Sequence, residues 1–86
     1  MAKKSTLLDQ MQANPTADWN IAKISRLCAK IGLEICPPAH GSHYTITSKY
    51  LSGILTIPAR RPIKPVYVRK LVALARAHLQ AAKEKP

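Results

Sequence analysis

The first clear pattern along the chain is a run of apolar residues at helical spacing. These residues are Ile21, Ile24, Leu27, Cys28 and Ile31. Steps of three and four positions place such residues on one face of a helix. Asp18 or Asn20 would begin this helix, and Gly32 would end it because glycine tolerates the left-handed conformation that closes many helices.

A second helical pattern fills the C-terminal part of the chain, from Pro65 to about residue 82. Its apolar stripe consists of Val68, Leu71, Val72, Ala75, Leu79 and Ala82. Proline suits the first turn of a helix because the N–H that it lacks would have no partner there. Arg69, Arg76 and Lys83 recur every seven residues and form a basic line on the outer face. We expect His78 at the edge of this helix.

Three short segments between the helices have the character of strands: residues 33–36, 42–47 and 54–57. Pro37 and Pro38 follow the first segment, which makes it a strand end or an edge strand because proline lacks the donor that a central ladder needs. Ser52 and Gly53 separate the second segment from the third. Short spacers favour antiparallel hairpins, since parallel neighbours need a long crossover.

These elements predict an α+β fold in the order helix, three antiparallel strands, helix. Both helices would cover one face of the three-stranded sheet, which gives two layers around one core. This is the architecture of a double-stranded-RNA-binding-like domain. We expect it to occupy residues 18–86.

Residues 1–17 form a predicted extension that carries a short helix. Ser5 could cap this helix, and Asn14-Pro15 would stop it. A helix of about two turns does not hold in water alone, so it must dock on the domain or on another subunit, or else fray. Trp19 is expected to pack the extension against the domain.

The charge of the chain points to a polyanionic partner. Its 86 residues include 14 lysines and arginines and 4 acids, which gives a formal charge of +10. Nucleic acid is the first candidate partner, an acidic protein the second and an anionic membrane a distant third. No apolar run approaches the roughly 20 residues that span a bilayer, and no signal-peptide core is present, so we expect a cytoplasmic protein.

The sequence shows no pattern of a metal or cofactor site. Cys28 and Cys36 lack the CxxC spacing of zinc ligands. They are interpreted as two small buried hydrophobic residues in a reducing compartment. The acids form no cluster that would hold magnesium, so we expect neither a metal nor a cofactor.

The triplet Gly-Ser-His at 41–43 is the strongest candidate for a functional centre. Alternation along the strand places Tyr44 and Ile46 on the core face and His43 on the open polar face. Tyr44 is therefore expected in the core rather than stacked on a base. A lone histidine at a strand start can also be structural or simply exposed, and the role of His40 stays open.

Several blocks of sequence together carry a family resemblance. Gly-Leu-Glu-Ile (32–35) leads toward the Gly-Ser-His strand start, a later strand ends Leu-Thr-Ile-Pro (55–58), and the basic block Ala-Arg-Arg-Pro-Ile-Lys-Pro-Val-Tyr-Val-Arg (59–69) follows. Over roughly residues 18–80 the chain resembles the HicA family of toxins from bacterial toxin–antitoxin pairs. The resemblance implies a small ribonuclease that cleaves messenger RNA, with His43 as the catalytic residue. It also implies a HicB-type antitoxin that covers this histidine.

RNA cleavage does not require a nucleophile from the enzyme, because the substrate supplies its own, the 2′-hydroxyl. Histidine suits the proton transfer because its unperturbed pKa is about 6.5, and cations stabilise the charge that develops on the phosphate. Without a carboxylate cluster for magnesium, we predict metal-independent cleavage. The RNA-contacting candidates are Gly41, Ser42, Lys23, Lys49, Arg60, Arg61, Lys64, Arg69 and Arg76.

Two alternatives stay open. The basic line on the last helix could be an ordinary solvated face, although the small number of acids favours contact with RNA or the antitoxin. The whole chain could also be a non-catalytic RNA- or DNA-binding module, because the fold alone does not separate a binder from an enzyme.

Overall fold

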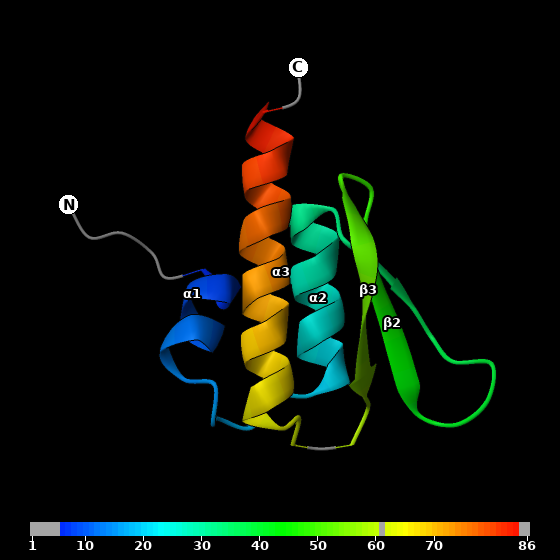
Figure 1. The fold of residues 1–86 in the computed structure, drawn as a ribbon. Coiled ribbons are helices and arrows are strands. Elements are labelled where there is room, and N and C mark those ends of the chain that lie inside the picture. Colours follow the sequence, from blue (N-terminus) through cyan, green and yellow to red (C-terminus); the bar gives the residue numbers. More distant parts are fainter. Residues whose placement is uncertain (1–5, 61, 85–86) are drawn as a thin grey trace.

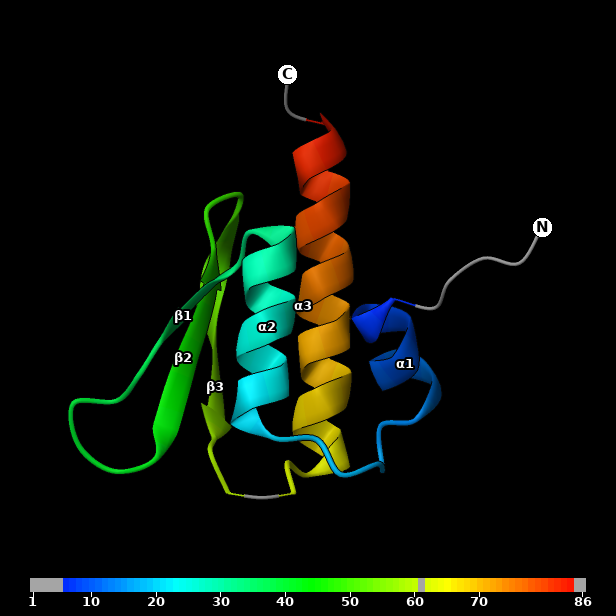
Figure 2. The ribbon, with the colours of Figure 1, turned by 180° about the vertical axis from the view of Figure 1, so that it is seen from behind.

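The computed structural model describes residues 6–60 and 62–84, which form three helices and one three-stranded sheet (Figure 1). The elements in chain order are α1 (Leu7–Ala13), α2 (Ile21–Ile31), β1 (Glu34–Cys36), β2 (His43–Ser48), β3 (Leu51–Pro58) and α3 (Pro65–Glu84). The predicted α+β class and the order helix, three strands, helix are confirmed. Helices α2 and α3 lie on the same side of the sheet (Figures 1 and 2). Within the described ranges, no helix is both long enough and apolar enough to cross a membrane.

The sheet is antiparallel, in the order β1-β2-β3. Ile46 in the central strand pairs with Ile35 on one side and Leu55 on the other, and it is fully buried. Since side chains alternate along a strand, this row faces the helices and the residues between face outward. The predicted split between a core face and an open face is therefore confirmed for β2.

The third strand is longer than predicted, because the turn falls at Lys49 and Tyr50 rather than at Ser52 and Gly53. Ser48 pairs directly with Leu51 across this turn. Gly53 lies inside β3 with φ +112°, close to a register shift in the ladder. A glycine with positive φ is typical of a bulge within a strand as well as of a turn, and the sequence alone did not distinguish the two.

The ends of α2 follow from two residues. The side chain of Asn20 accepts a hydrogen bond from the Lys23 N–H at 3.0 Å, so Asn20, not Asp18, is the N-cap. Gly32 adopts φ +86°, and its N–H donates to the Cys28 carbonyl at 2.9 Å. This is the left-handed helix end that only glycine adopts without strain.

The short helix α1 docks on α3, one of the options that its length left open. Met11 is fully buried and Leu8 nearly so. Thr6 caps α1 and exchanges two hydrogen bonds with Asp9. The predicted cap, Ser5, lies outside the described residues. Trp19 is buried, and its indole N–H donates to the Asn14 carbonyl at 2.7 Å, which confirms its predicted packing role.

Two predictions about single residues were wrong. His78 is not at the helix edge: it is 1% exposed and hydrogen-bonded on both ring nitrogens. Cys36 is exposed, because it lies on the outward side of an edge strand opposite Thr45. Cys28 is buried as predicted, and this burial raises the pKa of its thiol to about 11.

Candidate functional site

His43 begins β2 at the end of the sheet, where its side chain is exposed. Its cross-strand partner is Pro58, the last residue of β3, while the next pair, Tyr44 and Ile57, includes a fully buried isoleucine. Alternation therefore directs His43 away from the core, as the sequence pattern predicts. Gly41 precedes it with φ +79°, a conformation that disfavours any other residue at this bend.

His43 is one of the residues that line a hollow of about 250 Å³. The hollow is lined by Ser42, His43, Pro58, Arg60, Pro62, Lys64 and Tyr67. These residues come from the start of β2, the end of β3, the connecting segment and the first turn of α3. The fold thus brings His43 to the same hollow as two of its predicted cationic partners, Arg60 and Lys64.

Two backbone hydrogen bonds, from Ala59 and Ile63, hold the described residues on either side of Arg60. The N–H of Ala59 donates to the Ser42 carbonyl at 2.7 Å, which continues the pairing beyond the strand ends. The N–H of Ile63 donates to the Trp19 carbonyl at 2.8 Å, and the Ile63 side chain is buried in the core. Arg60 lies between these two anchors, is exposed, and lines the same hollow as His43.

Tyr67 is the residue at this hollow that the sequence analysis missed. It lies in the first turn of α3 and is half-buried against the core. The N–H of Tyr67 donates to the Lys64 carbonyl at 2.9 Å, which fixes the helix start next to the cationic segment. Its place two residues after Pro65, directly behind the basic linker, was the signal that could have found it.

Other predicted contact residues lie elsewhere. Lys49 follows the last residue of β2, at the opposite end of the strand from His43, and its Nζ lies 5.3 Å from the centre of the Tyr50 ring. Lys23 places its Nζ 5.4 Å from the Trp19 ring centre, in a different hollow. The fold does not bring either lysine to His43. Arg61 lies outside the described residues.

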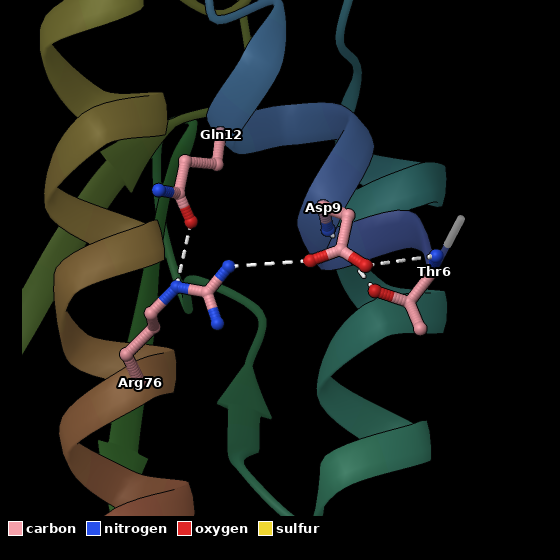
Figure 3. A network of polar contacts seen from close by, with 4 residues as sticks. All are labelled: Thr6, Asp9, Gln12 and Arg76. Atoms are coloured by element: carbon pink, nitrogen blue, oxygen red, sulfur yellow. Dashed lines mark hydrogen bonds and ion pairs between the residues drawn. The ribbon is translucent and has the colours of Figure 1, made fainter. Parts of the chain in front are cut away.

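The guanidinium of Arg76 contacts two side chains of α1. Its Nε donates to Oε1 of Gln12 at 2.6 Å, and an amino group of the same guanidinium lies 3.3 Å from Oδ1 of Asp9 (Figure 3). Arg69 lines a small hollow with Met11 along the same contact between α1 and α3. Of the predicted basic line, Arg76 therefore also contacts the N-terminal helix, while Arg69 and Lys83 are exposed. The sequence did not show this because the partners are more than 60 residues away.

The described residues contain no group of three or more histidines, cysteines or acids that could hold a metal ion. Metal-independent chemistry stays a prediction. Searches of protein-family models, of curated proteins and of solved structures found no match to this chain. Its functional interpretation depends on the residues and their geometry.

Proposed function

We propose that this chain is a HicA-like toxin of double-stranded-RNA-binding-like fold, a metal-independent endoribonuclease that cleaves messenger RNA in the cytoplasm. The observation that carries the proposal is the common hollow of His43, Arg60 and Lys64. A proton-transfer group beside two cations, on a protein of formal charge +10, matches what RNA cleavage needs.

In the proposed reaction, the Nε2 or Nδ1 atom of His43 takes the proton of a ribose 2′-hydroxyl. The oxygen then attacks the adjacent phosphorus, and the bond to the 5′-oxygen of the next nucleotide breaks. That oxygen leaves with the proton that His43 returns, directly or through a water molecule, so the products are a 2′,3′-cyclic phosphate, which water can open to a 3′-phosphate, and a 5′-hydroxyl. Arg60 and Lys64 stabilise the negative charge that builds up on the phosphate oxygens.

The proposed regulator is a HicB-type antitoxin that covers His43. A basic toxin surface favours an acidic partner, because complementary charge speeds encounter and fixes orientation. Covering the hollow would exclude RNA from the imidazole and from both cations at once.

One observation favours the alternative, a non-catalytic RNA- or DNA-binding module. No side chain among the described residues hydrogen-bonds to the imidazole of His43. General bases are usually oriented by a further group, so an unoriented histidine also suits a simple contact with nucleic acid.

A cleavage gel separates the two functions. Purified wild-type protein and the His43→Ala variant are incubated with messenger RNA, each with and without EDTA, and binding is measured in parallel by gel shift. A ribonuclease of the proposed kind cleaves in EDTA, and the variant loses turnover while it still binds RNA. If both folded proteins bind RNA and neither cleaves it, the chain is a binding module. Cleavage that EDTA abolishes and magnesium restores would contradict metal independence.

A further inference from the structure

A second and larger hollow lies among the helices, apart from the His43 site. Its volume is about 710 Å³, and residues of α1, α2 and the C-terminal half of α3 line it. Across the molecule the order is sheet, α2, α3 and α1 (Figures 1 and 2), and none of the residues around His43 contributes to this hollow. We call it the helical groove.

The floor of the helical groove is apolar. Leu7, Ile31 and Leu79 come one from each helix, and each is half-buried, so part of its apolar surface stays in contact with solvent. Leu27 and Trp19 close the base and are almost completely buried. A volume of this size lies within the roughly 300–1,000 Å³ of typical binding pockets.

One wall of the helical groove is cationic. Lys23, Arg26 and Lys30 are three and four positions apart on α2, so they form one exposed row along it. Among the described residues, no carboxylate pairs with any of these three cations. The ion pair between Arg76 and Asp9 lies on the contact of α1 with α3 instead.

We propose that the helical groove binds an acidic amphipathic helix of a partner protein. Its apolar face would cover Leu7, Ile31 and Leu79, and its carboxylates would face the row on α2. Recognition of this kind combines apolar burial in a groove with complementary charge at the rim. The partner would hold the protein at a surface separate from His43.

Charge and chemistry make other occupants less suitable. A second copy of this chain would bring its own formal charge of +10 to a cationic wall. The residues before Thr6 include Lys3 and Lys4, which have the same sign as the wall. Single-stranded RNA binds through accessible aromatic rings as well as cations, whereas the solvent-exposed part of this floor is aliphatic and Trp19 is 5% exposed.

The test uses a synthetic helical peptide with leucines on one face and glutamates on the other. Trp19 is the single tryptophan of the chain and lines the groove, so its emission reports binding directly. A second peptide of the same charge has serines in place of the leucines. The double variant Arg26→Glu/Lys30→Glu reverses the charge of two of the three wall residues, and Lys49→Glu/Lys70→Glu makes the same change in net charge at exposed positions outside the groove. Circular dichroism checks that all proteins fold.

We expect the leucine peptide to change the Trp19 emission of the wild-type protein. It should bind to the groove variant at least roughly tenfold more weakly than to the control variant. The serine peptide should bind to the wild-type protein as weakly as the leucine peptide binds to the groove variant. If the two peptides bind wild type with equal affinity, or if both variants lose the same affinity for the leucine peptide, the proposal is wrong. Binding would then result from unspecific electrostatic attraction. An RNA oligonucleotide that displaces the peptide and loses affinity only in the groove variant would assign the groove to RNA. A dimer in sedimentation that the peptide dissociates would assign it to a second copy.

Discussion

Nδ1 of His78 lies 2.6 Å from Oγ of Ser48, although 30 residues separate them in the sequence. Nε2 of the same ring lies 2.7 Å from the Ile31 carbonyl oxygen. A carbonyl only accepts, so in the neutral ring Nε2 donates and Nδ1 accepts the hydroxyl proton of Ser48. Oγ of Ser48 in turn accepts from the Tyr50 N–H at 3.1 Å. One buried imidazole thus joins α3 to the end of α2 and to the end of β2.

Replacing Ser48 by alanine should therefore destabilise the fold. The change leaves Nδ1 of His78 and the Tyr50 N–H without their partner, and an unsatisfied buried polar group costs about 1–3 kcal/mol. Urea unfolding followed by circular dichroism measures the loss. Ser52→Ala, at an exposed position in β3, is the matched control and should change the free energy of unfolding by less than about 0.5 kcal/mol. Equal effects of the two variants would contradict the role given to the His78 network.

This network shows what the sequence could not predict. Local periodicity placed Val68, Leu71 and Ala75 correctly in the core, because each follows the apolar stripe of α3. His78 also lies at a core position of that helix, but a histidine is buried only when partners for both nitrogens are nearby. Those partners come from α2 and β2, and their distance from His78 depends on the tertiary fold.

Docking of α1 should depend more on apolar burial than on its ion pair. Met11 is fully buried, so Met11→Ala should cost about 2–5 kcal/mol of docking free energy. Arg76→Ala removes exposed contacts, and an exposed pair contributes at most about 1 kcal/mol. Hydrogen exchange of the α1 amides measures the effect: exchange should accelerate strongly in the first variant and slightly in the second. The opposite order would mean that polar contacts dominate the docking.

Acid should weaken the N-terminal cap of α1 through Asp9, and with it the ion pair of this helix with Arg76. Hydrogen bonds from the backbone and side chain of Thr6, and then from Arg76, lower the pKa of this carboxyl below its ordinary value. A lowered pKa in the folded state means that the contribution is present above the ordinary aspartate value of about 4 and is lost as the pH falls below it. The emission of Trp19, which is bonded to Asn14 at the end of α1, should change over this range. In Asp9→Asn this part of the titration should be missing, and an identical titration would contradict the assignment.

The two cysteines should differ in reactivity. Burial raises the pKa of the Cys28 thiol to about 11, so only about one part in a thousand is thiolate at pH 8. Cys36 is exposed and accessible to reagent. With a chromogenic disulfide reagent at pH 8, one thiol should react rapidly in the folded protein and two in denaturant. Cys36→Ser should abolish the rapid phase, and a rapid phase that survives in this variant would contradict the burial of Cys28.

At the candidate site, too, local sequence patterns predicted some features, while others depend on the tertiary fold. The alternation from Tyr44 to Thr47 correctly predicted that His43 faces away from the core. The sequence named Arg60, Arg61 and Lys64 as the first cationic candidates and Lys49 and Lys23 as further ones, and the structure places Arg60 and Lys64, but neither Lys49 nor Lys23, at the hollow of His43. Lys49 is close to His43 in sequence but lies at the other end of β2, whereas Arg60 is far in sequence and lines the same hollow. The pairing of His43 with Pro58 and the hydrogen bond from the Ala59 N–H to the Ser42 carbonyl bring Arg60 close to His43 in the fold.

This difference between Arg60 and Lys49 gives a direct test of the proposed ribonuclease. A cation beside the phosphate stabilises charge that develops in the transition state, so Arg60→Ala should lower kcat roughly tenfold or more, and Lys64→Ala should act in the same direction. Lys49→Ala removes the same charge from the opposite end of the strand, so it should leave kcat nearly unchanged while it weakens RNA binding slightly through the loss of net charge. Single-turnover cleavage at saturating enzyme separates the chemical step from binding. Equal decreases of kcat in Arg60→Ala and Lys49→Ala would mean that the cations act only through the overall field of the protein, and the hollow around His43 would then not be the place where the phosphate reacts.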